Sequence, residues 1–315
     1  RDVDFRVSTM PLLDREKVVL RILDSKSSIL SLKELGFTDH NLDIILNNLK
    51  KPHGMFLVTG PTGSGKSTTL YSVLTELNKE NVNIVTLEDP VEYSVGGVSQ
   101  TQIRPEIGLS FANGLRSLLR QDPDIVMVGE IRDNETAELA VHAALTGHMV
   151  LSTLHTNNAL GAIPRLMDMK VEPFLISSAL NLVIAQRLVR KICTDCKEKL
   201  SIPTTLEQEV VLAIATMPPK FLPTDVSFKP PFTFWKGKGC AKCEDTGFRG
   251  RMAITEIVEV SPRLQQMIAS GQIGNLDQVQ AELKVQGLFD MRQDGIIKAL
   301  RGITTIEEVW GATKE

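Results

Sequence analysis

The sequence lacks any long hydrophobic run. No stretch approaches the ~20 consecutive apolar residues that a membrane-spanning helix needs, and the first residues do not form a signal peptide. Long-period repeats and low-complexity tracts are also missing, so a repeat architecture is not expected. Because residues 1–4 read like the interior of a domain, we expect a fragment, with any anchoring or docking region upstream.

Neither sign of charge dominates the chain. Lys and Arg number 35 against 38 Asp and Glu, which gives a net charge of −3, and no basic stretch is interleaved with aromatic residues. Both observations disfavour a nucleic-acid partner. With 42% hydrophobic and 23% charged residues over 315 positions, the composition is that of an ordinary soluble globular protein of about two domains.

Cysteine is scarce, and its placement is informative. The four cysteines form two C-x-x-C pairs, Cys193/Cys196 and Cys240/Cys243. Without a secretory context, reduced thiolates are expected rather than disulfides. Four thiolates favour a closed, tetrahedral, structural Zn²⁺ site. The separation between the pairs exceeds the usual spacing, so a loop must be accommodated, and a redox pair or free thiols remain alternatives.

Short apolar strands alternate with helices through the first half of the chain. We predict strands at 55–59, 83–87, 124–128 and 149–153, and helices at 66–79, 110–121, 134–145 and 158–168. This alternation predicts an α/β fold whose mostly parallel sheet is covered on both faces.

The pattern divides the chain into four parts. Val3, Phe5 and Val7 alternate with polar residues, which indicates strands, and two strands alone cannot bury their apolar face. The predicted parts are 1–24, a remnant of an N-terminal α+β domain; 25–190, an α/β domain with the alternating strands and helices; 191–250, a four-cysteine zinc-binding subdomain; and 251–315, a C-terminal helical subdomain.

A phosphate-binding motif, G-x-x-x-x-G-K-S, occupies Gly60–Ser67. It follows a predicted strand and opens a predicted helix, so its backbone N–H groups can cradle phosphate oxygens. Lys66 should neutralise the β- and γ-phosphates and Ser67 should ligate Mg²⁺. The guanine-reading N-K-x-D motif is absent, which favours ATP. The expected nucleotide-binding residues are Gly60, Pro61, Thr62, Gly63, Ser64, Gly65, Lys66, Ser67 and Thr68.

Acidic residues follow two further predicted strands. Glu88 ends one strand, and Glu130 follows another. Parallel α/β sheets place their ligands at the carboxyl ends of the strands. Hydrolysis needs a carboxylate to activate water and another to hold magnesium and its water shell. A single acid at a strand end is usually a solvated cap, but two such acids after a P-loop strand favour a catalytic pair.

These motifs resemble those of the type II secretion and type IV pilus assembly ATPases, a branch of the RecA-like P-loop motors. Glu88–Glu92 is similar to the family's Asp box, Leu119–Asp133 to its atypical Walker B motif, and Thr146–Asn157 to its His box. The resemblance covers nearly the whole chain, although residues 201–235 resemble nothing distinctive. It implies a RecA-like fold and ATPase activity.

The resemblance also implies roles for individual residues. Glu88 would act as the general base and Glu130 would organise Mg²⁺ through water, although the two roles could be exchanged. Arg6 and Arg21 match family arginines that reach the nucleotide from the N-terminal domain, and the alternative is a pair of solvent-facing strand arginines. Arg251 matches another arginine near the nucleotide.

The two histidines of the His box receive a coupling role. In the family, residues at the positions of His148 and His155 help to couple the γ-phosphate to the subunit interface. The alternative is that each is a hydrogen-bonded residue at the end of a strand.

The resemblance further implies a molecular machine. The chain would belong to a cytoplasmic homo-hexamer, peripheral to the inner face of the plasma membrane, with nucleotide at the subunit interfaces. Its partners would be an inner-membrane platform protein and a membrane-recruiting component, and not nucleic acid. A four-cysteine site is typical of secretion and pilus-extension ATPases. A retraction ATPase, a nucleic-acid translocase and a non-catalytic nucleotide-binding regulator remain alternatives.

Overall fold

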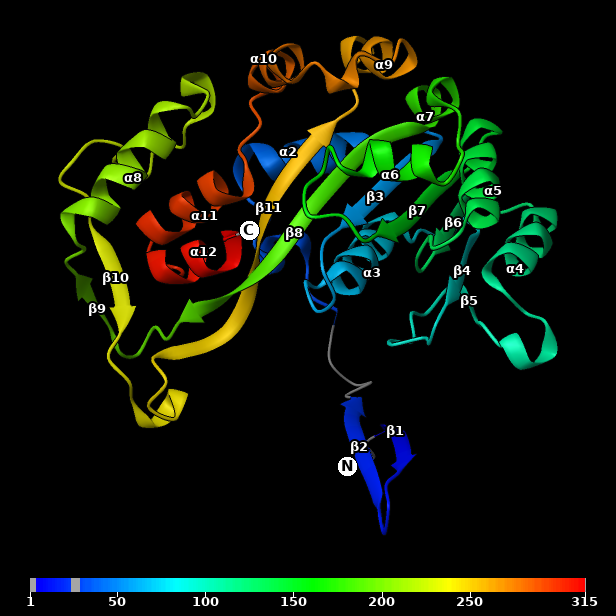
Figure 1. Ribbon diagram of the computed structural model, residues 1–315, viewed down its shortest axis with the longest axis horizontal. Coiled ribbons are helices and arrows are strands. Elements are labelled where there is room, and N and C mark those ends of the chain that lie inside the picture. The colour runs from blue at the N-terminus through cyan, green and yellow to red at the C-terminus, as the bar shows by residue number, and fades with distance from the viewer. Residues whose placement is uncertain (1–3, 24–28, 315) are drawn as a thin grey trace.

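The computed structural model describes residues 4–23 and 29–314 (Figure 1). Within these residues, the largest sheet has seven strands in the order β11-β8-β3-β7-β6-β4-β5. Its neighbouring strands run parallel, apart from β11, which is antiparallel to β8. The strands are β3 Gly54–Thr59, β4 Ile84–Glu88, β5 Val98–Gln102, β6 Ile125–Val128, β7 Met149–Leu154, β8 Leu180–Ile192 and β11 Phe248–Glu259. The predicted α/β class with a mostly parallel sheet is confirmed.

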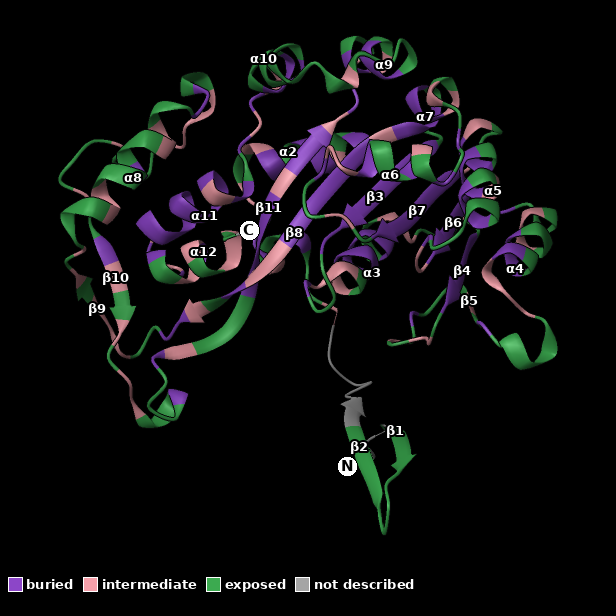
Figure 2. Cartoon of the chain, in the orientation of Figure 1, coloured by how far each residue is buried: buried purple, intermediate pink, exposed green. Residues whose placement is uncertain are grey.

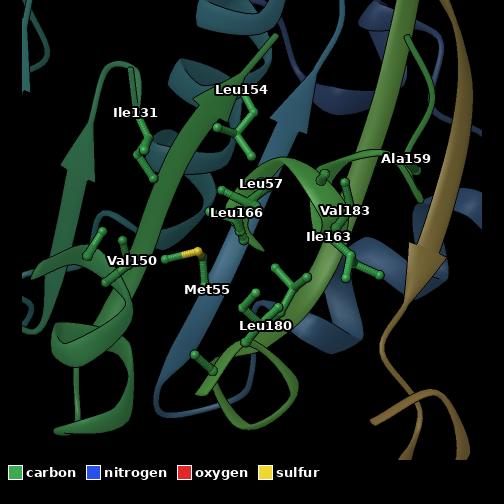
Figure 3. Close-up of a cluster of buried hydrophobic side chains, with 14 of the residues drawn as sticks. Met55, Leu57, Ile131, Val150, Leu154, Ala159, Ile163, Leu166, Leu180 and Val183 are labelled. Carbon is green, nitrogen blue, oxygen red and sulfur yellow. The ribbon is translucent and has the colours of Figure 1, made fainter. Parts of the chain in front are cut away.

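Helices cover both faces of this sheet. Side chains alternate along β3, so that Met55 and Leu57 join one buried cluster (Figure 3) and Phe56 and Val58 join another. Helices α1 Leu32–Leu35, α2 Asp39–Asn48 and α3 Lys66–Leu77 pack on the Phe56 side. Helices α4 Phe111–Leu118, α5 Asn134–Leu145, α6 Ala162–Asp168, α7 Pro173–Ala179, α9 Pro262–Ala269 and α10 Leu276–Gln286 pack on the Met55 side. The sheet is therefore buried throughout its centre (Figure 2).

A third apolar cluster lies beyond the edge of the sheet (Figure 1). It joins α8 Thr204–Ala215, α11 Met291–Leu300 and α12 Ile306–Thr313 to strand β10 Phe234–Gly237, which pairs with β9 Lys197–Leu200. Single 3₁₀ turns lie at Pro105–Ile107, Leu119–Gln121, Pro219–Phe221, Ala241–Cys243 and Gln272–Gly274. The C-terminal part is helical after β11, as predicted.

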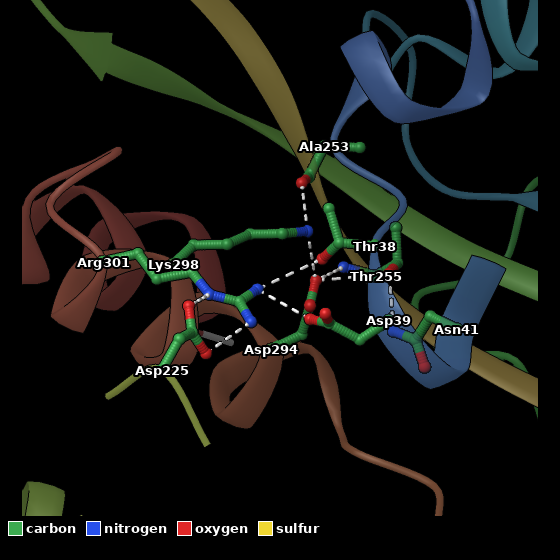
Figure 4. A network of polar contacts seen from close by, with 9 residues as sticks. All are labelled: Thr38, Asp39, Asn41, Asp225, Ala253, Thr255, Asp294, Lys298 and Arg301. Carbon is green, nitrogen blue, oxygen red and sulfur yellow. Dashed lines mark hydrogen bonds and ion pairs between the residues drawn. The ribbon is translucent and has the colours of Figure 1, made fainter. Parts of the chain in front are cut away.

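Hydrogen bonds and ion pairs connect α11 to strand β11 and helix α2 (Figure 4). The buried Lys298 pairs with Asp294 at 2.7 Å and donates to the backbone oxygen of Ala253 on β11 at 2.8 Å. Arg301 pairs with Asp39, at the first residue of α2, at 2.7 Å, and with Asp225 at 2.8 Å. We call these five side chains, Asp39, Asp225, Asp294, Lys298 and Arg301, the α11 network.

The remaining strands form a separate hairpin, β1 Asp4–Pro11 with β2 Glu16–Leu23. Its apolar side chains are exposed, with Phe5 at 53% and Leu20 at 58%. This agrees with the expectation that two strands cannot bury a face alone. None of the helices in the described ranges has the length and apolar character needed to cross a bilayer.

The seven-stranded sheet contains three strands that the sequence did not predict. They are β5, β8 and β11. Strand β11 runs across the predicted boundary between 250 and 251, so residues on both sides of that boundary belong to the central sheet. The four-part division itself stays a prediction. Helix α6 begins at Ala162 rather than near 158, because the side chain of Asn158 accepts a hydrogen bond from the N–H of Gly161 and forms a turn there.

Candidate nucleotide site

A cavity of about 610 Å³ opens at the carboxyl ends of the central strands. The P-loop follows β3, Glu88 ends β4, Glu130 follows β6 and His155 follows β7. These strands are neighbours in the sheet, which brings distant segments together. The lining residues that were singled out from the sequence are Thr62, Gly63, Gly65, Lys66, Ser67, Thr68, Glu88, Glu130, His155 and Arg251.

The P-loop is shaped by glycines and by its own lysine. Gly65 caps α3 at φ 87°, where a side chain would be strained. Lys66 Nζ donates to the carbonyl oxygens of Gly60 at 2.9 Å and Pro61 at 3.1 Å. Burial lowers the pKa of Lys66, and the charge of Glu130 opposes that shift. The ammonium thus lies over the loop, where the oxygens of a phosphate could replace the carbonyls.

Gln186 on β8 supports the loop from behind. It is fully buried, donates to the backbone oxygen of Ser64 at 2.8 Å and accepts from Thr69 on α3 at 2.9 Å. A Cβ atom at Gly60 would lie 2.5 Å from the backbone oxygen of Gln186, so only glycine fits there. Sequence analysis did not predict this role. A glutamine within the apolar run of residues 182–189 was the available signal.

Glu88 lies in a buried cluster with three hydrogen-bond donors. Its carboxylate accepts from Tyr71 of α3, from Thr86 at 2.6 Å and from Gln100 of β5 at 2.9 Å. A carboxylate offers about four acceptor positions, which leaves one for a water molecule in the cavity. The sequence predicted Glu88 but none of its three donors.

Glu130 lies between an arginine and a histidine. Its carboxylate pairs with Arg132, and its other oxygen is 3.6 Å from His155 Nε2. The Glu130 side chain is 14% exposed and faces the cavity. The structure therefore brings together Lys66, Glu88, Glu130 and His155, which the sequence singled out separately.

The remaining residues predicted from the sequence do not all line the cavity. His148 immediately precedes β7, at the opposite end of that strand from His155, and its Nδ1 lies 3.0 Å from the backbone oxygen of Ala143. Within this chain, His148 is therefore outside the cavity. Arg6 and Arg21 are opposite each other in the register of the hairpin, and their side chains lie outside the described part of the structure. Arg251 on β11 reaches the cavity from the edge of the sheet.

The four cysteines converge as predicted. Their sulfur atoms lie within 4.8 Å of one another, with Cys193–Cys240 at 3.9 Å and Cys196–Cys243 at 3.8 Å. Tetrahedral Zn–S bonds of ~2.3 Å would place sulfurs about 3.8 Å apart, so the cluster fits a metal ion.

The thiol pKa values within this cluster differ. Burial raises the thiol pKa of Cys196 to about 12 and also raises that of Cys240. For Cys243, burial raises the pKa, but hydrogen bonds from the backbone N–H groups of Cys240 and Gly247 and from neighbouring thiols outweigh burial and lower it to about 7. A lower thiol pKa favours the thiolate that a metal requires.

The family follows from a comparison of sequences. Residues 1–311 match the family described as "Type II/IV secretion system protein". The chain belongs to this family. Among its type II/IV secretion relatives, "Type II secretion system ATPase E" of Vibrio cholerae is 49% identical over 317 residues, covering 100% of this chain and 59% of that protein. "Type IV pilus assembly ATPase PilB" of Myxococcus xanthus is 47% identical, covering 99% of this chain and 53% of that protein. The chain thus spans little more than half the length of these relatives.

Two solved structures share the fold of this chain. The "Crystal Structure of the Pilus Retraction Motor PilT and Bound ADP" superposes with a TM-score of 0.68 at 28% identity, covering 99% of this chain and 74% of that one. The Legionella pneumophila ATPase DotB gives a TM-score of 0.68 at 23% identity, covering 98% of this chain and 72% of that one, and shows the fold alone.

Proposed function

We propose that this chain is the ATP-hydrolysing part of a motor that assembles a type IV pilus or a type II secretion pseudopilus. The main support is that Lys66 of the P-loop lines one cavity together with Glu88 and Glu130, which come from two other segments of the chain. The names of the two curated relatives and the ADP bound to the retraction motor support the same reading.

The cavity suggests a division of labour among its residues. The P-loop N–H groups and Lys66 would bind the phosphates, and Ser67 with Glu130 would hold a magnesium ion. That ion would supply positive charge to the phosphates. Glu88, fixed by its three donors, would orient the attacking water and accept its proton. His155, which contacts Glu130, would help to couple the γ-phosphate to the subunit interface.

Binding and hydrolysis test this proposal together. Calorimetry of the full-length protein should detect binding of magnesium–ATP, and Glu130→Gln should retain binding while hydrolysis falls by roughly 100-fold or more. Undetectable binding by the folded parent protein would refute the proposal. If Glu130→Gln hydrolyses ATP at the parent rate, its assigned role is wrong.

We further propose that the four cysteines hold a structural zinc ion. The separations of their sulfur atoms support this. Metal analysis of the purified protein should find about one zinc per chain, and a strong chelator should unfold the region around β9 and β10. A chain without metal that keeps this region folded would argue against the proposal.

For the assembly, we propose a homo-hexamer with nucleotide at the subunit interfaces. His148 fits this arrangement, because a residue outside the cavity of its own chain could serve a neighbour. We also propose that Arg6 and Arg21 reach the nucleotide. The partners would be an inner-membrane platform protein and a recruiting component at the cytoplasmic face of the membrane. Deletion of the gene, scored for secretion, piliation and DNA uptake, distinguishes the clients. Persisting filaments that cannot retract would instead favour a retraction motor.

A further inference from the structure

One buried hydroxyl group connects the phosphate-binding helix to the acidic loop. Tyr71 lies on α3, five residues after Lys66, and its side chain is buried. Its hydroxyl donates to the Glu88 carboxylate and accepts from the backbone N–H groups of Glu92 at 3.1 Å and Tyr93 at 3.4 Å. A phenol has one donor and up to two acceptor positions, and all three are used here.

Gln100 on β5 completes the connection from the other side. Its amide nitrogen donates to Glu88 at 2.9 Å and to the backbone oxygen of Tyr93 at 2.9 Å, while its oxygen accepts from the N–H of Val95 at 2.8 Å. The same two side chains, Tyr71 and Gln100, therefore hold both the carboxylate and the loop that follows it. We call Tyr71, Glu88 and Gln100 the acid-positioning cluster.

The hydroxyl of Tyr71 keeps its proton and therefore remains a hydrogen-bond donor to Glu88. Burial raises the pKa of Tyr71, and the hydrogen bond to Glu88 and the charge of that carboxylate raise it further. The phenol therefore stays protonated over the physiological range. Tyr71 is part of α3, and its hydroxyl is bonded to Glu88. If α3 shifts when phosphates bind to the P-loop, Tyr71 would move with it and change the position of the Glu88 carboxylate.

We infer that Tyr71 is a positioning residue, which couples occupation of the P-loop to the orientation of the Glu88 carboxylate in the cavity. This inference rests on the proposed function, since it requires Glu88 to act on a water at the terminal phosphate. Tyr71 lines the same cavity, but its hydroxyl is directed to Glu88 and to the backbone N–H groups of Glu92 and Tyr93, and Tyr71→Phe would remove only that hydroxyl. Its loss is therefore expected to slow hydrolysis without weakening nucleotide binding.

The test is Tyr71→Phe in the full-length protein, which removes the hydroxyl and keeps the ring. We expect kcat to fall roughly 10- to 100-fold, as for loss of a hydrogen bond to a charged group, with KM for magnesium–ATP within about twofold. Tyr93→Phe is the matched control. The ring of Tyr93 meets Tyr71 edge-on with centroids 5.3 Å apart, but its hydroxyl takes no part in the cluster, so its kcat should stay at the parent value.

A double-mutant cycle separates positioning from general damage. If Tyr71 acts through Glu88, Tyr71→Phe should reduce single-turnover hydrolysis by less than about twofold in a Glu88→Gln background. Full additivity, an unchanged kcat, or a raised KM with unchanged kcat would each overturn the inference.

A second variant guards against misfolding. Gln100 is only partly buried on the edge strand β5, so Gln100→Leu should fold and lower kcat by about 3- to 10-fold. If Tyr71→Phe does not fold, an unchanged kcat in Gln100→Leu refutes the positioning cluster. A parent protein that neither binds nor hydrolyses ATP would refute the proposed function instead.

Discussion

Two groups of charged side chains in this molecule differ in how completely they are paired. In the α11 network, Lys298 is 1% exposed and its ammonium contacts both Asp294 and the Ala253 carbonyl. In the cavity, the hydrogen bonds of Lys66 within the described residues go to carbonyl oxygens of its own loop, and Glu130 faces the cavity beside Arg132 and His155.

The difference follows from what burial costs. A charge removed from water must be compensated by partners within the protein, and the α11 network supplies them. A charge beside a cavity can keep water until a ligand arrives. The α11 network therefore stabilises the folded chain, whereas the cavity keeps charged groups available for the nucleotide that we propose binds there.

The strongest test breaks the α11 network. Asp294→Ala leaves the ammonium of Lys298 buried without its carboxylate, and we expect a loss of about 3–5 kcal/mol in the free energy of unfolding. Denaturant titration measures it. Asp225→Ala, which removes a 56% exposed carboxylate from Arg301, should cost less than about 1 kcal/mol. Equal losses in both variants would show that burial does not govern the network.

The cavity should respond in the opposite way. Lys66→Met removes the charge expected on the phosphates, and hydrolysis should fall by roughly 100- to 1,000-fold. Stability should change by less than about 0.5 kcal/mol, because the ammonium bonds only to its own loop. Steady-state kinetics and denaturant titration on the same preparation decide this. A variant that is mainly unstable would place Lys66 with the architectural charges.

Much of the fold could be predicted because its central strands are short, apolar and followed by regular helices. The positions of β3, β4, β6 and β7 were confirmed within one or two residues. Strands β8 and β11 were missed because they form a long antiparallel pair, interrupted by polar residues such as Gln186 and Glu256, with the cysteine-containing segment between them. Their pairing is set by contacts between residues far apart in sequence, which local periodicity does not record.

The sequence predicted the acidic residues and the P-loop of the candidate site, but not the residues that hold them in place. Lys66, Glu88 and Glu130 stand in recognisable motifs. Tyr71 and Gln186 look like ordinary residues of a helix and a strand. Their roles depend on which atoms lie opposite them after folding, and sequence spacing does not specify that.

A third test removes an uncharged side chain, Gln186, which supports the P-loop beneath the cavity. Gln186→Leu leaves the Ser64 carbonyl and the Thr69 hydroxyl without their buried partner, which should cost about 1–3 kcal/mol of stability. Binding of magnesium–ATP should also weaken, because the P-loop loses its rear contact. Thr69→Val removes one of the two bonds and should have a smaller effect on both. If the two variants bind nucleotide like the parent, Gln186 supports the fold and not the loop.

The smallest expected effect concerns a buried acid that is held by a backbone group. Glu256 on β11 accepts from the N–H of Ala159 at 3.0 Å and lines a cavity of about 190 Å³ with Asp290 and Lys284. Burial raises the pKa of Glu256 above its ordinary value of 4.5, and the charge of Asp290 adds to this. The folded state therefore binds a proton more tightly than the unfolded state.

The sign of the pH dependence follows from that proton. The contribution of Glu256 is most favourable below pH 4.5 and is lost as the pH rises through its raised folded-state pKa. Glu256→Gln keeps an acceptor for Ala159 and carries no charge, so it should be slightly more stable than the parent at pH 7, with the gain vanishing in acid. Glu259→Gln, at a 38% exposed acid beside Lys51, should show no such gain. A Glu256→Gln protein less stable than the parent at pH 7 would mean that the carboxylate has a compensating cation, as in the α11 network.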